Sequence, residues 1–240
     1  MSGGVYSKSK QDNGQFYYEF IEPALKQIWG WDLSENVTWF IATAGWNQKD
    51  IANFHDAVKT RGGVSIIMMD NISQLTNYIN SKDVENSNLT SARLDDKITA
   101  FSAFSHGLYT TDGGTIEYGY GFSNASDLSM NKGHIATLKT RAFDNAVSLI
   151  ASCNPGTTYE NSFAQAWADK TAGFVGTAYA YVGQSYYGSI NDGSRNPFMK
   201  LSHRFIQPYA GGSRNYPVAA TNKTAAGESP YLRAFTSSWR

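Results

Sequence analysis

The strongest constraint on the fold of this chain is a mostly apolar run that ends beside its only cysteine. The run covers residues 146–151, Cys153 follows it, and the chain then turns at the Asn-Pro-Gly sequence of residues 154–156. A short apolar run closed by turn residues is typical of a fully buried strand, most often in a parallel sheet. Cys153 would then lie at the carboxyl end of that strand, where open α/β sheets place their chemistry.

A second apolar run has the same shape and ends at a histidine. It covers residues 98–104, and His106 and Gly107 follow. We expect the two strand ends to lie side by side and to bring His106 to Cys153. A lone cysteine is more often a small buried hydrophobe, but a strand-end position beside a histidine favours a reactive thiol. The N–H groups of Gly107 and Cys153 would be the donors for a developing oxyanion.

The remaining patterns predict strands that alternate with helices across the middle of the chain. Residues 81–96 read as a polar loop and residues 108–127 as a short hairpin or extended excursion. We expect a lead-in with a helix over residues 1–35 and a single domain over residues 36–240. Alternation of this kind predicts an α/β fold, a three-layer α/β/α sandwich with a mostly parallel central sheet. The predicted strands are 37–42, 64–69, 98–106, 146–153, 174–182 and 231–235, and the predicted helices are 16–29, 49–61, 72–79, 162–173 and 197–206.

Composition and charge exclude several classes of function. Twenty basic and 20 acidic residues give zero formal net charge without like-charge blocks, which excludes electrostatic steering to nucleic acid or an anionic membrane. No apolar run is long enough to span a bilayer, and the N-terminus lacks a signal-peptide pattern. A single cysteine excludes an internal disulfide framework. Neither zinc spacing nor a phosphate-binding loop occurs, so we expect no metal and no cofactor. The composition resembles that of an extracellular or delivered protein, such as a toxin or effector module of a larger secreted protein.

Both strand ends resemble those of the caspase–legumain–gingipain superfamily of cysteine peptidases, including its bacterial caspase-like relatives. In that family one apolar strand ends in His-Gly, here His106-Gly107, and a later one ends in a small residue and then Cys, here Ser152-Cys153. The resemblance covers roughly residues 36–182. It implies a caspase-like fold and hydrolysis of a peptide bond in a polypeptide substrate through a thioester intermediate. Cys153 would be the nucleophile and His106 its base, and no third residue is required.

At the positions that line the substrate pocket in this family, this chain lacks the charged residues that many relatives carry. They correspond here to Trp46, Ala151, Tyr179 and Tyr181, none of which is charged, so a preference for Asp, Arg or Lys does not transfer. Asp192 in the following loop would favour a basic side chain, although a solvated loop aspartate is the simpler interpretation. Relatives are often activated by cleavage of their own loops, for which residues 108–127 and 183–196 are the candidates.

Two alternatives to a peptidase stay open at this point. The first is a catalytically inactive binding or scaffold domain on the same fold, with its Tyr- and Gly-rich loops as the interface. The second is another thiol-dependent acyl transfer, such as transpeptidation. The other histidines, His55, His134 and His203, read as ordinary polar residues outside the site.

Overall fold

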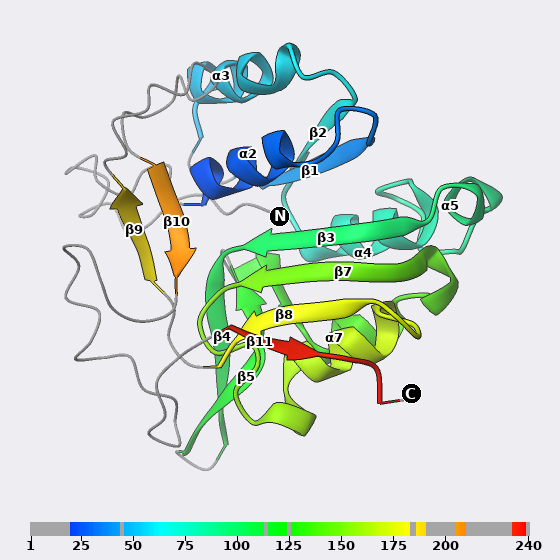
Figure 1. Cartoon of the computed structure of the whole chain (residues 1–240), viewed down its shortest axis with the longest axis vertical. Helices are drawn as coiled ribbons and strands as arrows, with labels where there is room; N and C mark the ends of the chain where they lie inside the picture. The colour runs from blue at the N-terminus through cyan, green and yellow to red at the C-terminus, as the bar shows by residue number, and fades with distance from the viewer. Residues whose placement is uncertain are drawn as a thin grey trace.

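The protein is a mixed α/β structure that contains a mostly parallel sheet (Figure 1). The computed structural model describes residues 20–43, 46–112, 115–123, 126–182, 186–190, 205–209 and 232–238. Within these ranges, no helix is long and apolar enough to cross a membrane.

Three parallel strands form the centre of the largest sheet. They are β3 (Ile98–Phe104), β7 (Phe143–Ala151) and β8 (Thr177–Tyr181), and β11 (Leu232–Phe235) pairs antiparallel with β8 at the edge, in the order β11-β8-β7-β3. A separate parallel pair consists of β1 (Val37–Ala42) and β2 (Val64–Met69). Both strands of this pair occupy the ranges that their apolar patterns predict.

Side-chain caps fix where several of the predicted helices begin. Asn47 and Asn71 each form a capping box at the start of α3 (Gln48–Lys59) and α4 (Ile72–Ser81), and Ser162 caps α7 (Phe163–Thr171). Such caps satisfy amide groups that the first helical turn leaves without partners. The remaining helices are α2 (Ile21–Gly30), α5 (Ser91–Asp95) and α6 (Lys132–Thr137).

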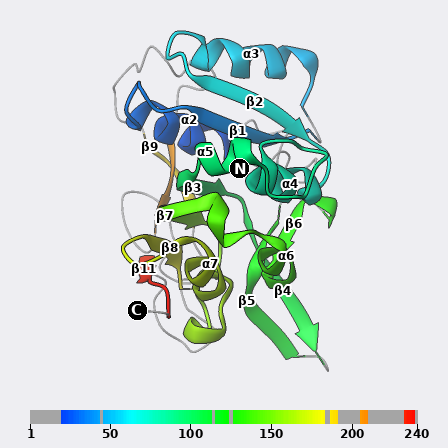
Figure 2. The same cartoon turned by 90° about the vertical axis from the view of Figure 1, so that its right-hand side faces the viewer.

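The apolar faces of the strands are buried in two clusters. One cluster joins α4, α6 and α7 to the strands, and the other joins α2 and α3 to them. Figure 2 shows α6 and α7 together to the right of β7 and β8. Within the first cluster the indole N–H of Trp167 donates a 2.9 Å hydrogen bond to Ser148 Oγ, which explains why a hydroxyl is tolerated in the buried run of β7.

The segment between β3 and β7 forms a three-stranded antiparallel sheet. It contains β4 (His106–Asp112), β5 (Thr115–Ser123) and β6 (Ser129–Asn131), which confirms a hairpin after His106. A further antiparallel pair is β9 (Tyr186–Ile190) with β10 (Phe205–Tyr209). Short 3-10 turns occupy 126–128, 140–142 and 159–161.

Three predictions from the sequence are corrected by the structure. The polar stretch 81–96 contains the one-turn helix α5, which Thr90 caps. Phe205 and Ile206 lie in the strand β10, so the predicted helix cannot extend over them; the rest of its range, up to residue 204, lies outside the described residues. The strand β7 ends at Ala151, two residues before the cysteine, because the chain bends from Ser152 onward.

Candidate active site

The ends of β3 and β7 bring His106 and Cys153 to the same edge of the sheet. The two strands are parallel neighbours, their register pairs Phe104 with Ala151, and the N–H of Ser105 donates to the carbonyl of Ala151 at 3.4 Å. His106 and Cys153 each follow the last paired residue by two positions. The expected juxtaposition of the two strand ends is therefore present, with both residues beyond the carboxyl ends of parallel strands.

Gly107 lies directly against the backbone of Cys153. A Cβ atom at Gly107 would lie 1.9 Å from the carbonyl oxygen of Cys153 and 2.9 Å from its Cβ. No side chain fits at either distance, so only glycine permits this approach. The contact places the first residues of β4 and the turn after β7 side by side at the site.

An aromatic ring next to α2 packs against the imidazole of His106. Phe20, immediately before that helix, contacts it edge to face, with ring centroids 4.8 Å apart and an interplanar angle of 85°. Phe20 belongs to the same buried cluster as Phe104 and Ala151, so the imidazole lies on the α2 face of the sheet. His106 itself is half-buried, which leaves part of the ring accessible.

Cys153 is the accessible residue in a stretch that is otherwise buried. Ala151 and Ser152 are fully buried and Asn154 is 7% exposed, whereas Cys153 is half-buried and forms no disulfide. A thiol that served only as core packing would be closed off like its neighbours. The partial exposure of Cys153 fits a thiol that meets a reactant.

Hydrogen bonds fix the turn that follows the cysteine. The N–H of Gly156 donates to the carbonyl of Tyr181 at 3.0 Å, and the N–H of Ala164 in α7 donates to the carbonyl of Pro155 at 2.9 Å. Asn154 has a positive φ of 61°, a conformation that asparagine tolerates better than most residues. The turn is thereby tied to β8 and to the first turn of α7.

Gly119 of the hairpin strand β5 packs against the turn that follows Cys153. Its φ is +80°, and a Cβ atom there would lie 2.2 Å from the carbonyl oxygen of Thr157. The contact of Gly119 could not be predicted from the sequence, because a glycine in a hairpin strand carries no signal of the distant segment it touches. The same holds for Phe20, whose contact with His106 depends on the placement of α2.

The predicted substrate-binding residues divide into a buried group and an exposed residue. Trp46, Ala151 and Tyr181 lie in one buried cluster, so the structure brings them together, with Ala151 fully enclosed. Burial raises the pKa of the Tyr181 phenol far above its ordinary value. Tyr179, two residues earlier on β8, is 39% exposed. Asp192 lies outside the described residues.

The remaining histidines take structural positions where they are described. His55 is exposed on α3, while His134 caps α6 by accepting a hydrogen bond at Nδ1 from the N–H of Asn131. His203 lies outside the described residues. In the described part of the chain no group of three or more histidine, cysteine or acidic side chains could hold a metal ion.

Comparison with known proteins identifies no relative of this chain: no family model, no curated protein and no solved structure matches it.

Proposed function

We propose that the protein is a cysteine endopeptidase in which Cys153 is the nucleophile and His106 the general base. The observation that carries the proposal is the contact of Gly107 with Cys153 at the paired carboxyl ends of β3 and β7. The two residue types needed for thiol catalysis lie on adjacent strand ends, and the cysteine is partly accessible. Its substrate is a polypeptide.

The proposal extends to the architecture, a three-layer α/β/α sandwich of the caspase-like kind. Two features support it: buried clusters join helices to both faces of the strands, and the sheet is mostly parallel with an antiparallel strand at the edge. The His-Gly and Ser-Cys strand ends occupy adjacent positions in that sheet. The order of these motifs along the chain agrees with the same family resemblance.

The chemistry follows from these residues. His106 takes the proton of the Cys153 thiol, the thiolate attacks the substrate carbonyl carbon, and the oxygen becomes an anion. The N–H groups of Gly107 and Cys153 stabilise that anion, and the C–N bond then breaks as His106 returns the proton to the leaving amine. A thioester remains on Cys153. A water molecule that His106 deprotonates attacks the thioester carbonyl carbon, the C–S bond breaks to release the acid, and the proton on His106 returns to the Cys153 sulfur.

The single cysteine allows a direct test. Intact-mass measurement of iodoacetamide labelling reports on Cys153 alone, because the chain has no other thiol. We expect rapid labelling at pH 6 to 7 in the wild type and a slow rate, typical of an unactivated thiol, in His106→Ala. His134→Ala is the matched control, since that histidine is half-buried but caps α6.

Turnover is measured by mass spectrometry of a digested proteome, with Cys153→Ala and His106→Ala beside the wild type. Peptides cut by the wild type and by neither variant would support the proposal and would also define the cleavage-site residue. Cleavage that persists in both variants would contradict it. Slow labelling of Cys153 in the wild type, together with no peptide cleavage, would indicate a binding domain. Ligated products in the presence of added amines would indicate transpeptidation.

The same measurements test self-processing. Wild-type protein that loses mass on incubation, beside Cys153→Ala protein that does not, would show cleavage within the chain. Identical intact masses after long incubation would exclude it.

A further inference from the structure

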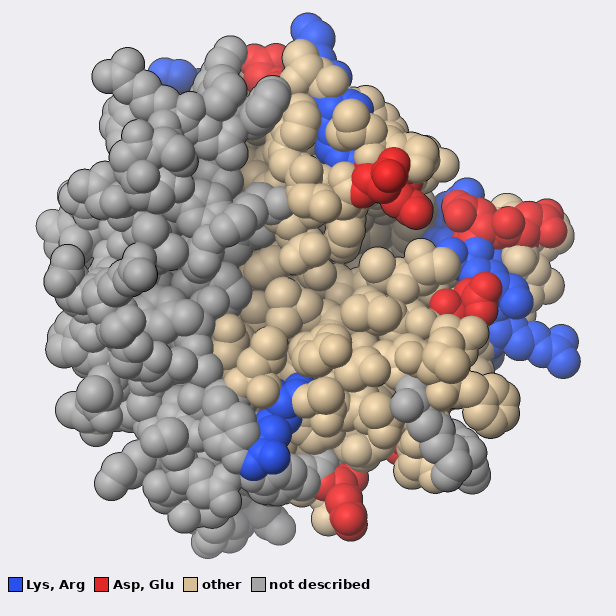
Figure 3. Space-filling model, in the orientation of Figure 1, with Lys and Arg blue, Asp and Glu red and all other residues tan. Residues whose placement is uncertain are grey.

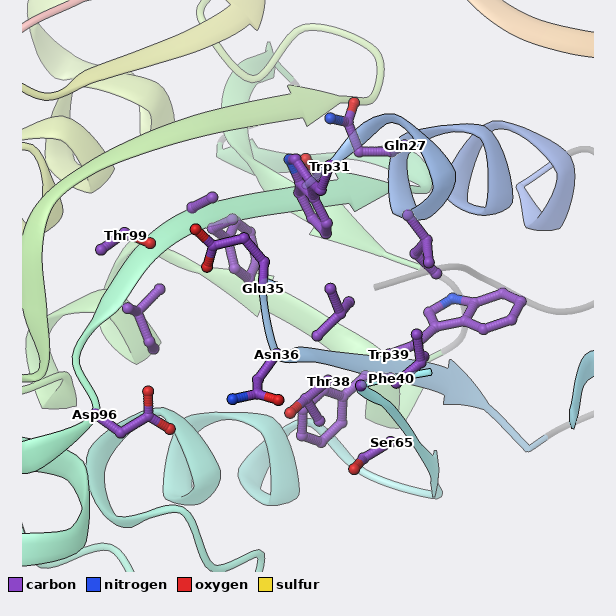
Figure 4. A pocket seen from close by; sticks show the side chains of 18 of the residues that line it. Gln27, Trp31, Glu35, Asn36, Thr38, Trp39, Phe40, Ser65, Asp96 and Thr99 are labelled. Atoms are coloured by element: carbon purple, nitrogen blue, oxygen red, sulfur yellow. The ribbon is translucent and has the colours of Figure 1, made fainter. Parts of the chain in front are cut away.

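A cavity of about 840 Å³ lies between β1 and β3, away from the proposed active site. Neither His106 nor Cys153 lines it; residues 36–40 line it at the start of β1 and residues 97–102 line it along β3. It opens as a hollow on the face drawn in Figure 3, and Figure 4 shows side chains from α2, β1 and β3 around it. Its volume falls within the range of ligand pockets.

Several polar side chains at the cavity have no partner within the described part of the protein. Gln27 reaches it from α2, Glu35 and Asn36 reach it from the turn before β1, and Thr99 reaches it from β3. None of these four side chains forms a hydrogen bond or an ion pair with a described residue. Figure 4 shows Glu35 and Thr99 on opposite sides of the cavity.

These unpaired groups define the polarity of a ligand. A carboxylate accepts hydrogen bonds, a carboxamide both donates and accepts them, and so does a hydroxyl. An apolar ligand would separate these groups from water without giving them a partner, which is costly. A ligand that fills the cavity must therefore offer hydrogen-bond donors and acceptors along its length.

The charges around the cavity favour a ligand without net charge. The acidic side chains of its lining are Asp32, Glu35 and Asp96, and the basic ones are Lys82, Arg93 and Lys97. Lys82 forms an ion pair with Asp96, and the Arg93 guanidinium donates to the carbonyls of Tyr78 and Asp96. Three acids face three bases, so the attraction of an ionic ligand to one set is offset by repulsion from the other.

An indole ring lies beside the unpaired polar groups. Trp31 is half-buried, and Figure 4 shows its side chain extending into the cavity next to Gln27. No aromatic ring of the described chain packs against this indole. The face of an aromatic ring carries negative potential and attracts hydrogen atoms of partial positive charge, such as those of the C–H groups on the face of a sugar ring.

We propose that the cavity binds a neutral carbohydrate, in the form of a short oligosaccharide. One sugar ring stacks on Trp31, and the hydroxyl groups at the rim of the sugar pair with Glu35, Asn36 and Thr99. The lined part of β1 corresponds to five extended residues, roughly 17 Å, which is longer than a single sugar ring. This binding is separate from the proposed peptidase activity.

The test uses the wild-type chain and needs no peptidase activity. Neutral trimers of glucose, galactose, mannose and N-acetylglucosamine are screened as an immobilised array, and those that bind are measured by isothermal titration calorimetry. Trimers of glucuronic acid and of glucosamine serve as anionic and cationic probes of the same length. We expect saturable binding of at least one neutral trimer, and roughly tenfold weaker binding of both charged trimers because their charges would be buried without a free partner.

Protein variants locate the binding. Trp31→Ala removes the stacking surface and should weaken binding about tenfold, whereas Leu33→Ala changes an exposed side chain of the same turn that does not line the cavity and should have no effect. Glu35→Ala should also weaken binding about tenfold, and Glu85→Ala, at an exposed carboxylate outside the cavity, is its control.

Circular dichroism checks that the variants fold, and Glu35→Ala keeps the test valid if Trp31→Ala does not fold. Loss of binding in the cavity variants beside unchanged binding in their controls would support the proposal. Absence of binding by every neutral trimer, tighter binding of a charged trimer, or binding that persists in both cavity variants would overturn it.

Discussion

Replacement of Gly107 by alanine tests the geometry of the site most directly. The new methyl carbon would lie 1.9 Å from the Cys153 carbonyl oxygen, while real Cβ atoms essentially never come within 3.0 Å of another heavy atom. The ends of β4 and β7 must therefore separate by about 1.1 Å. Neither side can yield cheaply, because the two nearest contacts, with the carbonyl oxygen and carbonyl carbon of Cys153, are with backbone. The strand β4 is paired with β5, and the turn after Cys153 is bonded to β8 and α7.

The expected effects on chemistry and on stability are of similar size. A misplacement of about 1 Å between catalytic groups can cost roughly a hundredfold in rate. Overpacking of this kind typically costs about 1–3 kcal/mol of unfolding free energy, which a domain of ordinary stability survives. Gly107→Ala should therefore stay folded, label slowly with iodoacetamide at Cys153 and cleave peptides at least a hundredfold more slowly.

A second glycine provides the matched control. Gly30 ends α2, and a Cβ atom there would meet nothing within 4 Å, so Gly30→Ala should label and unfold like the wild type. Labelling rate and urea unfolding are measured for all three proteins. A Gly107→Ala protein with wild-type labelling and wild-type stability would refute the contact between Gly107 and Cys153, and with it the proposed site.

Three further predictions concern stability. Burial raises the pKa of the Tyr181 phenol in the folded state, so its contribution to the free energy of unfolding is complete below the unfolded-state pKa near 10 and is lost as the pH rises. By pH 11 the free energy of unfolding should fall by about 1.4 kcal/mol. Urea unfolding at pH 9 and pH 11 should show a smaller fall for Tyr181→Phe than for the wild type. Arg61 donates to the carbonyls of Ile28, Asp32, Glu35 and Gly62, so Arg61→Lys should lower the free energy of unfolding by about 2–4 kcal/mol, whereas exposed Lys59→Ala should change it little. Asn71→Ala removes the capping box of α4 and should cost about 1 kcal/mol; an unchanged urea midpoint would contradict the role of that cap.

Much of the secondary structure could be predicted from local patterns. The apolar runs at 37–42 and 64–69 became β1 and β2, and asparagine caps before residues 48 and 72 began α3 and α4. Such signals are local, because burial of a strand or capping of a helix depends on neighbouring residues. Helix α5 was not predicted because its single turn lies within a polar stretch without apolar periodicity.

The candidate site was predictable in part. Apolar strands that end at His106 and Cys153 lead to adjacent strand ends, provided that the strands are parallel neighbours. Sequence spacing does not reveal that Ala151 is fully enclosed, because its burial depends on helices from elsewhere in the chain. It also cannot place Phe20 against His106.

The sequence by itself determined several strands and helices, such as β1, β2, α3 and α4, and which two strand ends carry a thiol and an imidazole. Only the tertiary structure decided that Gly107 touches Cys153, that Gly119 touches Thr157, and that β1 and β3 enclose a cavity. Local patterns record which faces of a segment are buried. Register and contact between distant segments depend on how all the elements pack together, and no single stretch of sequence encodes that packing.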